Sequence, residues 1–160
     1  MPGTLPRRPP RRAGDTLLAR PEIAALVPHA GAMCLLDRVL SWDAAGILCA
    51  ARSHLDPANP LRRAGRLAAL CGLEYALQAA ALHGALRDGR PQPAGYAASL
   101  RDVALLVPWL DDPAHGELRV GAVLEQKESA GLLYALRVEA GHGAVLVSGR
   151  AAVALPRGPA

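Results

Sequence analysis

The chain contains no phenylalanine, and aromatic residues make up only 3% of its 160 residues. Its hydrophobic content of 51% comes mainly from Ala, Leu and Val. A core made of these residues must pack small and branched side chains closely instead of large rings. That amount of apolar material is enough for one sizeable core, and the length favours one domain over two.

Cysteine is also scarce. Cys34, Cys49 and Cys71 are odd in number and widely spaced, with no Cys-x-x-Cys pair and no histidine spaced as a second ligand pair. This pattern argues against both a disulfide framework and a zinc site. We therefore expect buried thiols of a reducing compartment, a cytoplasmic location and no metal.

The common nucleotide and hydrolase motifs are missing as well. There is no G-x-x-x-x-G-K-[ST] loop and no G-x-S-x-G elbow, and "GHGAVLVSG" has no third glycine at dinucleotide spacing. The sequence therefore indicates no nucleotide cofactor.

Acidic residues are absent from the opening "MPGTLPRRPPRRAG", which holds four arginines. Subtracting these four from the 18 basic residues leaves 14, equal to the 14 acidic residues of the chain. We expect residues 1–19 to be a disordered basic tail and residues 20–160 to be the folded domain. A contact of the tail with nucleic acid or a membrane surface stays open, but the balanced domain indicates no nucleic-acid partner.

Long hydrophobic runs are missing too. The opening has no apolar stretch of the kind that forms a secretory signal. Charges interrupt every later apolar run before it reaches the length needed to span a bilayer, so we expect no membrane span.

Proline and glycine divide the first part of the chain into segments. A short helix is predicted over Glu22 to Val27, stopped by Pro28. Two strands are predicted in "AMCLLDRVLSW" and "GILCAARSH", joined as a hairpin. The loop "LDPANPLRRAG" carries two prolines that deny backbone donors, so it cannot continue the sheet.

A long helix is predicted from Arg66 to about Arg87, with Gly89 and Pro91 as stop signals. It is apolar on nearly all sides, which is typical of a buried helix. Four strands are predicted after it, in "GYAASLRDVALLV", "ELRVGAVLEQKE", "GLLYALRVEAG" and "AVLVSGRAAVAL". The predicted fold class is α+β, with an antiparallel sheet curled around one helix.

Two polar residues stand out against this pattern. His54 lies at the end of the second strand, where a ring is fixed yet reachable, and Glu74 lies inside the apolar helix. An imidazole can accept a proton near neutral pH and a desolvated carboxyl can keep one, so the pair suits proton transfer. A structural or solvated His54 and a Glu74 on a solvated helix edge are the alternatives.

The helical spacing places Gln78 on the same stripe as Glu74, one turn away. Cys71 also lies on this stripe, but it has no neighbouring base, which favours a core thiol over a nucleophile. Three further histidines lie near helix or turn ends beside glycines, and we assign them to solvent or to capping: His83, His115 and His142.

Two segments, "PHAGAMCLLDRVL" and "LEYALQAAALHG", resemble the 3-hydroxyacyl-[acyl-carrier-protein] dehydratases of the hotdog fold, the FabA/FabZ group. The combination of "SHLDPANPLRRAGRL", "AGYAASLRDVALLV" and "SGRAAVAL" is similar to the dehydratase-like proteins encoded with aryl-polyene and related polyketide-type pathways. The resemblance covers nearly everything after the tail. It implies a hotdog, with a long central helix wrapped by a curved antiparallel sheet of about five to six strands.

The resemblance also implies a site, usually at the boundary between two subunits, and no cofactor or metal. His54 would be the general base that removes the proton alpha to a thioester carbonyl, and Glu74 the acid that protonates the departing 3-hydroxyl. Backbone N–H groups near the start of the helix, about Leu67 to Leu70, would stabilise the enolate oxygen. The expected substrate contacts are Gln78, Cys71, Leu70 and Gly72.

The sequence departs from the family in the loop after His54. The family's G-H-F-P-G is here "SHLDPAN", the loop is longer than usual, and "RRAGRL" stands where a Pro-Gly opens the helix. The arginines of this loop would dock an acidic acyl carrier protein and its phosphopantetheine phosphate, or else lie in solvent. They are Arg62, Arg63 and Arg66.

The leading hypothesis is a hydro-lyase that makes 2-enoyl thioesters from 3-hydroxyacyl groups bound to acyl carrier protein, in fatty-acid, aryl-polyene or polyketide-type biosynthesis. It would act as a homodimer or as a hotdog heterodimer. One alternative is an acyl thioesterase in which Glu74 directs water at the carbonyl. Another is a non-catalytic partner that stabilises an active hotdog dehydratase subunit.

Overall fold

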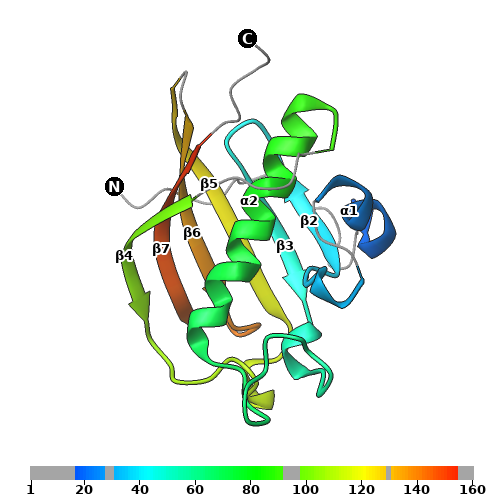
Figure 1. The fold of residues 1–160 in the computed structure, drawn as a ribbon, viewed down its shortest axis with the longest axis vertical. Coiled ribbons are helices and arrows are strands. Elements are labelled where there is room, and N and C mark those ends of the chain that lie inside the picture. Colours follow the sequence, from blue (N-terminus) through cyan, green and yellow to red (C-terminus); the bar gives the residue numbers. More distant parts are fainter. Residues whose placement is uncertain (1–16, 28–30, 92–97, 129–130, 155–160) are drawn as a thin grey trace.

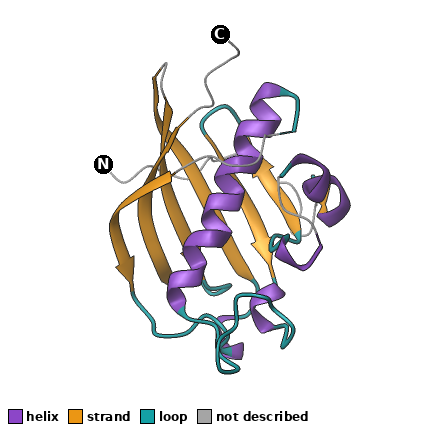
Figure 2. Ribbon diagram, in the orientation of Figure 1, coloured by secondary structure: helices purple, strands orange, loops and turns teal. Residues whose placement is uncertain are grey.

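One long helix lies against one face of a curved antiparallel sheet (Figures 1 and 2). The computed structural model describes residues 17–27, 31–91, 98–128 and 131–154. In this part of the chain the sheet has seven strands in the order β1-β2-β3-β5-β6-β7-β4. The hotdog architecture implied by the resemblance is confirmed.

The elements follow the predicted order. The helices are α1 (Arg20–Leu26) and α2 (Gly72–Asp88), and four short 3₁₀ helices span Gly31–Met33, Ser53–Leu55, Ala69–Cys71 and Pro113–His115. The strands are β1 (Leu18–Ala19), β2 (Arg38–Trp42), β3 (Gly46–Ala51), β4 (Ala98–Leu105), β5 (Leu118–Glu128), β6 (Gly131–Glu139) and β7 (Val145–Ala154).

The sheet has one strand more than the six expected at most, because β1 joins its edge. Leu18 pairs with Val39 of β2, and the amide of Leu17 donates to the carbonyl of Val39 at 2.9 Å. Residues 17–19, which the sequence assigned to the tail, thus pair with the edge of the sheet. Residues 1–16, which make up the rest of the predicted tail, lie outside the described residues.

The long helix begins later than its composition predicts. Composition favours a start at Arg66, but α2 starts at Gly72. The amide of Ala69 donates to the carbonyl of Pro108, and the amide of Leu110 donates to the carbonyl of Leu67. These bonds and the bridge between Ala68 and Trp109 hold this segment out of the α-helix, and Ala69–Cys71 forms a 3₁₀ turn, so tertiary pairing overrides helix propensity there. The helix ends as predicted, with Gly89 in the left-handed conformation at φ 68°.

The core lies between α2 and the sheet and is built from small and branched residues. Leu73, Ala76, Ala79 and Leu82 of α2 are buried. A methyl group added at Gly72 would lie 2.9 Å from Cγ2 of Val147, so glycine lets the start of the helix approach β7. Within the described part of the chain, no helix is long and apolar enough to cross a membrane.

Two of the three histidines assigned to solvent or capping are buried, and that assignment was wrong for them. His83 is fully buried between the hydroxyl of Tyr134, at 2.8 Å from Nδ1, and the carbonyl of Asp43, at 2.7 Å from Nε2. A carbonyl only accepts, so Nε2 carries the proton and Nδ1 accepts from the tyrosine. His115 is 8% exposed, whereas His142 is exposed as expected.

Candidate functional site

His54 lies in the 3₁₀ turn Ser53–Leu55 that follows β3, and its side chain is fully buried. Burial lowers the pKa of the ring from 6.5 to about 4, and the backbone of Gly116 opposes this shift. Gly116 does not reach hydrogen-bond geometry, and neither ring nitrogen has a hydrogen-bond partner in the described structure. The ring is therefore neutral at pH 7, with a lone pair that nothing in the described chain uses.

The residue before His54 is fixed by a polar network that reaches α2. The hydroxyl of Ser53 donates to the carbonyl of Leu35 at 2.7 Å, and it accepts from the hydroxyl of Tyr75 at the same distance. The side-chain amide of Asn59 donates to the carbonyl of Ser53 and to the hydroxyl of Tyr75. Burial raises the pKa of Tyr75 to about 12, so its hydroxyl stays a donor in this network.

Glu74 lies in the first turn of α2 and is half-buried. No hydrogen bond joins it to the ring of His54, because neither ring nitrogen has a partner. The residue of α2 that reaches the His54 segment is its neighbour Tyr75. The structure thus places the predicted acid near the start of the helix without pairing it with the predicted base.

Gln78 lies one turn further along α2 and is buried. Its oxygen accepts from the amide of Leu35 at 3.0 Å, and its nitrogen donates to the carbonyl of Met33 at 2.6 Å. Both ends of this amide are bonded to the segment before β2. Gln78 therefore holds that segment in place, and its role in substrate binding stays a prediction.

The other predicted substrate contacts surround the start of α2. Leu70 is 58% exposed, Cys71 is half-buried and Gly72 is buried. The amides of Ala69 and Cys71 donate to the carbonyls of Pro108 and Ala68. The amide of Ala69 belongs to the predicted oxyanion donors, about Leu67 to Leu70, and it is already bonded to a carbonyl.

The three loop arginines differ in their surroundings. Arg62 is mostly buried, whereas Arg63 is exposed. Arg66 pairs with Asp111 at 3.1 Å and lies over the ring of Trp109, 4.3 Å from its centroid. Arg63 is exposed, and the hydrogen bonds of its side chain go only to carbonyls of its own loop.

Sequence reasoning missed a carboxylate that anchors the end of β3. Glu117 accepts from Arg38, from Arg119 at 2.6 Å and from Arg52 at 3.0 Å. Burial alone would raise its pKa, but the three arginines outweigh burial and lower the pKa to about 2. Arg52 lies two positions before His54, so this cluster adjoins the segment that carries the predicted base. No local pattern marks Glu117 as the centre of this cluster, because Arg38 and Arg52 lie on distant segments.

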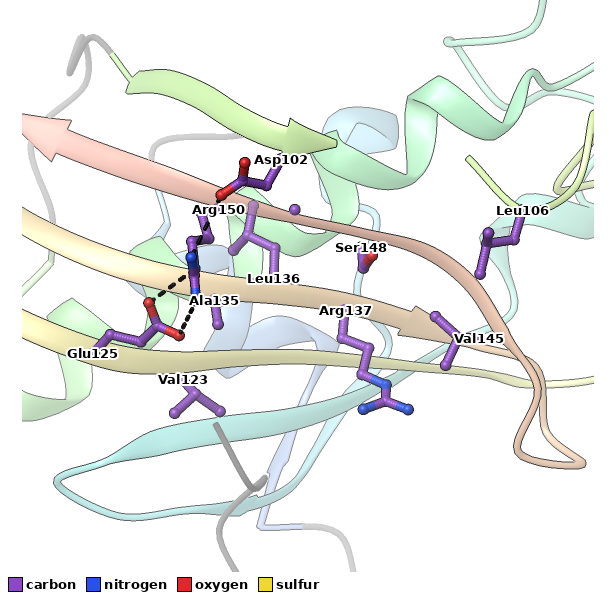
Figure 3. A pocket seen from close by; sticks show the side chains of 11 residues that line it. Asp102, Leu106, Val123, Glu125, Ala135, Leu136, Arg137, Val145, Ser148 and Arg150 are labelled. Atoms are coloured by element: carbon purple, nitrogen blue, oxygen red, sulfur yellow. Dashed lines mark hydrogen bonds and ion pairs between the residues drawn. The ribbon is translucent and has the colours of Figure 1, made fainter. Parts of the chain in front are cut away.

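A separate groove of about 370 Å³ lies on the face of the sheet opposite α2 (Figure 3). Its polar lining includes Arg150, which pairs with Glu125 at 3.1 Å and with Asp102 at 3.4 Å. None of the predicted site residues lines this groove. Among the described residues no cluster of side chains could hold a metal ion.

Comparison with known proteins decides the family. A family model described as ApeP dehydratase (ApeP-like) matches residues 21–160. The chain belongs to the ApeP-like dehydratase family. This agrees with the resemblance to aryl-polyene dehydratase-like proteins. None of the curated proteins compared with the chain matches it.

Solved structures agree on the fold of this ApeP-like chain. A chain of the dehydratase heterocomplex ApeI:P from Xenorhabdus doucetiae is 19% identical with a TM-score of 0.71, over 84% of this chain and 91% of that one. The PaaI protein from the phenylacetic acid degradation operon of Escherichia coli is 13% identical with a TM-score of 0.52, over 73% and 81%. A thioesterase from Staphylococcus aureus is 9% identical with a TM-score of 0.52, over 74% and 92%.

The arginine cluster around Glu117 predicts a pH-dependent stability difference. Because the pKa of Glu117 falls from 4.5 to about 2 on folding, its charge stabilises the fold above pH 4.5, and this stabilisation is lost as the pH falls towards 2. Glu117→Gln should therefore lower the free energy of unfolding by about 1–3 kcal/mol at pH 7. In urea titrations from pH 7 to pH 2, the difference from wild type should shrink below pH 4.5. A difference that stays constant over this range would contradict the assignment.

Proposed function

We propose that this protein removes water from 3-hydroxyacyl thioesters bound to acyl carrier protein, giving 2-enoyl thioesters in fatty-acid, aryl-polyene or polyketide-type biosynthesis in the cytoplasm. Membership of the ApeP-like dehydratase family supports the reaction class. The observation that carries the proposal is the fully buried ring of His54 with both nitrogens unpaired.

A buried polar group without a partner costs about 1–3 kcal/mol, so an unpaired buried ring calls for an explanation beyond stability. Catalysis supplies one. His54 is neutral at pH 7 because burial lowers its pKa to about 4, and a neutral imidazole can accept a proton. In the proposed reaction it takes the proton at C2 of the substrate, and the thioester carbonyl receives the electron pair as an enolate.

Glu74 completes the elimination. The enolate collapses to the C2–C3 double bond, the C3–O bond breaks, and Glu74 gives its proton to the departing hydroxyl, which leaves as water. The reaction needs no redox cofactor, since it neither oxidises nor reduces the substrate. The family resemblance implies a site at the boundary between two subunits, and we propose that each His54 works with the acid of a second subunit.

The edge strand β4 is the surface we propose for that second hotdog subunit. β4 pairs only with β7 in the described sheet, which leaves its other edge open (Figure 1). An open edge is a template for pairing with another chain. Large apolar side chains are exposed along this strand and beside the start of α2: Leu70, Leu100, Val103, Leu105, Leu106 and Trp109. The structural likeness to a chain of a dehydratase heterocomplex supports a hotdog partner over an unrelated one.

The decisive variants are His54→Ala and Glu74→Gln. Each should lower the rate of water loss from 3-hydroxyacyl carrier protein by about 100-fold or more, because each removes one proton-transfer group. Mass spectrometry of the carrier-bound product measures this, since water loss lowers its mass. The assay is run on the protein alone and together with the hotdog dehydratase subunit of the same pathway. The exposed Arg90 serves as a control, and Arg90→Ala should leave the rate unchanged.

Three other outcomes of this assay would contradict the proposed dehydratase activity of this chain. Release of free thiol from the acyl carrier protein, instead of water loss, would show a thioesterase. Water loss by the mixture that survives both substitutions would show a non-catalytic partner subunit. Wild-type protein that is inactive across chain lengths, alone and in the mixture, would exclude the dehydratase.

The β4 surface has its own test. Leu100→Lys combined with Leu105→Lys should abolish the dimer, because it places two charges where the partner would bury apolar side chains. Both side chains are already exposed, so the fold itself should survive, and circular dichroism checks this. Light scattering after gel filtration measures the assembly. Gln126→Lys, an exposed change on β5, is the matched control. Unchanged assembly in the double variant would exclude β4 as the interface.

A further inference from the structure

Arg62 lies at the centre of the loop that follows His54. Its side chain is only 15% exposed, and it makes four hydrogen bonds within the chain. Nη2 donates to the carbonyl of His54 at 3.1 Å, and Nε donates to the carbonyl of Asp56 at 2.8 Å. Nη1 donates to the carbonyl of Gly65 at 2.9 Å and to the carboxylate of Asp111 at 3.2 Å. One guanidinium thus joins both ends of the loop.

The loop needs such a donor because of its sequence. Pro57 and Pro60 have no backbone N–H, so they cannot supply bonds to the carbonyls around them. A guanidinium carries five N–H donors in a rigid fork, which suits several carbonyls that converge on one place. The tight turn of Ala64 and Gly65, both at positive φ, brings the far end of the loop back to Arg62.

The partner of Arg62 connects the loop to the start of α2. Asp111 is 7% exposed and also pairs with Arg66. Its neighbour Leu110 donates to the carbonyl of Leu67, just before the helix. The chain of contacts therefore runs from the backbone of His54 through Arg62 and Asp111 to the helix start.

We propose that Arg62 is a positioning residue, which fixes the backbone of His54 relative to the start of α2 and does not dock the acyl carrier protein. This inference rests on the proposed function, in which His54 is the base. In this proposal Arg63 is the arginine that docks the acyl carrier protein. It is exposed, and its side chain is bonded only to carbonyls of its own loop, at Pro60 and Arg62.

Arg62→Lys is the most informative variant, because lysine keeps the charge but cannot span four acceptors with one ammonium group. A displacement of a catalytic group by about 1 Å can cost on the order of 100-fold in rate. We expect kcat to fall about 10- to 100-fold on two substrates, the 3-hydroxyacyl carrier protein and the matching 3-hydroxyacyl pantetheine thioester. The KM for the carrier-bound substrate should change less than about twofold, because Arg62 makes no contact with the carrier.

Variants of two other arginines separate a positioning role from a docking role. Arg63→Ala should raise the KM for the carrier-bound substrate and leave the pantetheine thioester unaffected. Arg90→Ala should change neither. If Arg62→Lys instead raises only the KM for the carrier-bound substrate, Arg62 is a docking residue and the proposal is wrong.

The titration of the His54 ring, followed by NMR, gives a readout that does not depend on activity. In wild-type protein we expect a midpoint near the pKa of about 4. In Arg62→Lys the loosened loop admits water, so the midpoint should move towards 6.5. The charges of His115 and Asp37 also affect the pKa of this ring, but both residues are unchanged in Arg62→Lys. The positive charge at position 62 is kept as well. An unchanged midpoint together with an unchanged kcat would overturn the proposal.

The two proposals fail in distinguishable ways. If wild-type protein removes no water, the dehydratase proposal fails, while the ring titration still decides whether Arg62 positions His54. Should Arg62→Lys not fold, Asp111→Asn replaces it, because it removes the charge partner of Arg62 but leaves the guanidinium in place. A fall in kcat smaller than that expected for Arg62→Lys, with a partial shift of the midpoint of the His54 titration, would support the proposal. A wild-type kcat together with a wild-type midpoint would contradict it.

Discussion

The burial of α2 against the sheet is the interaction on which the rest of this structure depends. The helix is mostly apolar, and three of its buried polar side chains each bond to a different segment. Tyr75 bonds to Ser53 beside the predicted base, Gln78 bonds to the segment before β2, and His83 bonds to the turn after β2. Since these groups are buried, leaving any of them unpaired would cost more than the bond itself contributes. The helix therefore both fills the core and fixes the loops that form the candidate site.

His54 is the exception to this pairing. The backbone on either side of it is held by Ser53 and by Arg62, while its own ring nitrogens have no partner in the described structure. A rigid backbone under an unpaired ring is what a general base needs, because the ring must meet a proton that only the substrate brings. Among the described residues β4 pairs along one edge only, and this edge is the surface proposed for a second hotdog subunit.

The elements of this fold could largely be predicted from local patterns. The Ala- and Leu-rich helix, its stop at Gly89 and the alternation along β6 are properties of neighbouring residues, and all three are present. The start of the helix and the strand β1 could not be found in this way, because both depend on pairing with distant segments. Tertiary pairing of this kind overrides propensity without leaving a local mark.

The residues of the candidate site were likewise only partly predictable from local sequence patterns. His54 stood out by its place at a strand end before a proline-containing loop and Glu74 by its place inside an apolar helix, and the family resemblance gave them roles that stay predictions. The bond from Arg62 to Asp111 spans 49 residues and the bond from Arg52 to Glu117 spans 65, so local spacing could not reveal either pair. The assignment of His83 to solvent failed for a related reason, since a histidine beside a glycine gives no sign of a buried tyrosine elsewhere in the chain.

Hydrogen exchange at C2 of the substrate tests the role of His54 most directly. Glu74→Gln protein, in its active assembly, is incubated with a 3-hydroxyacyl thioester in deuterium oxide, and the recovered substrate is analysed by mass spectrometry. With the base present and the acid removed, the account predicts deuterium at C2 without net loss of water, and no deuterium once His54→Ala is added. Deuterium uptake or water loss that persists in the double variant would contradict the assignment of His54 as the base.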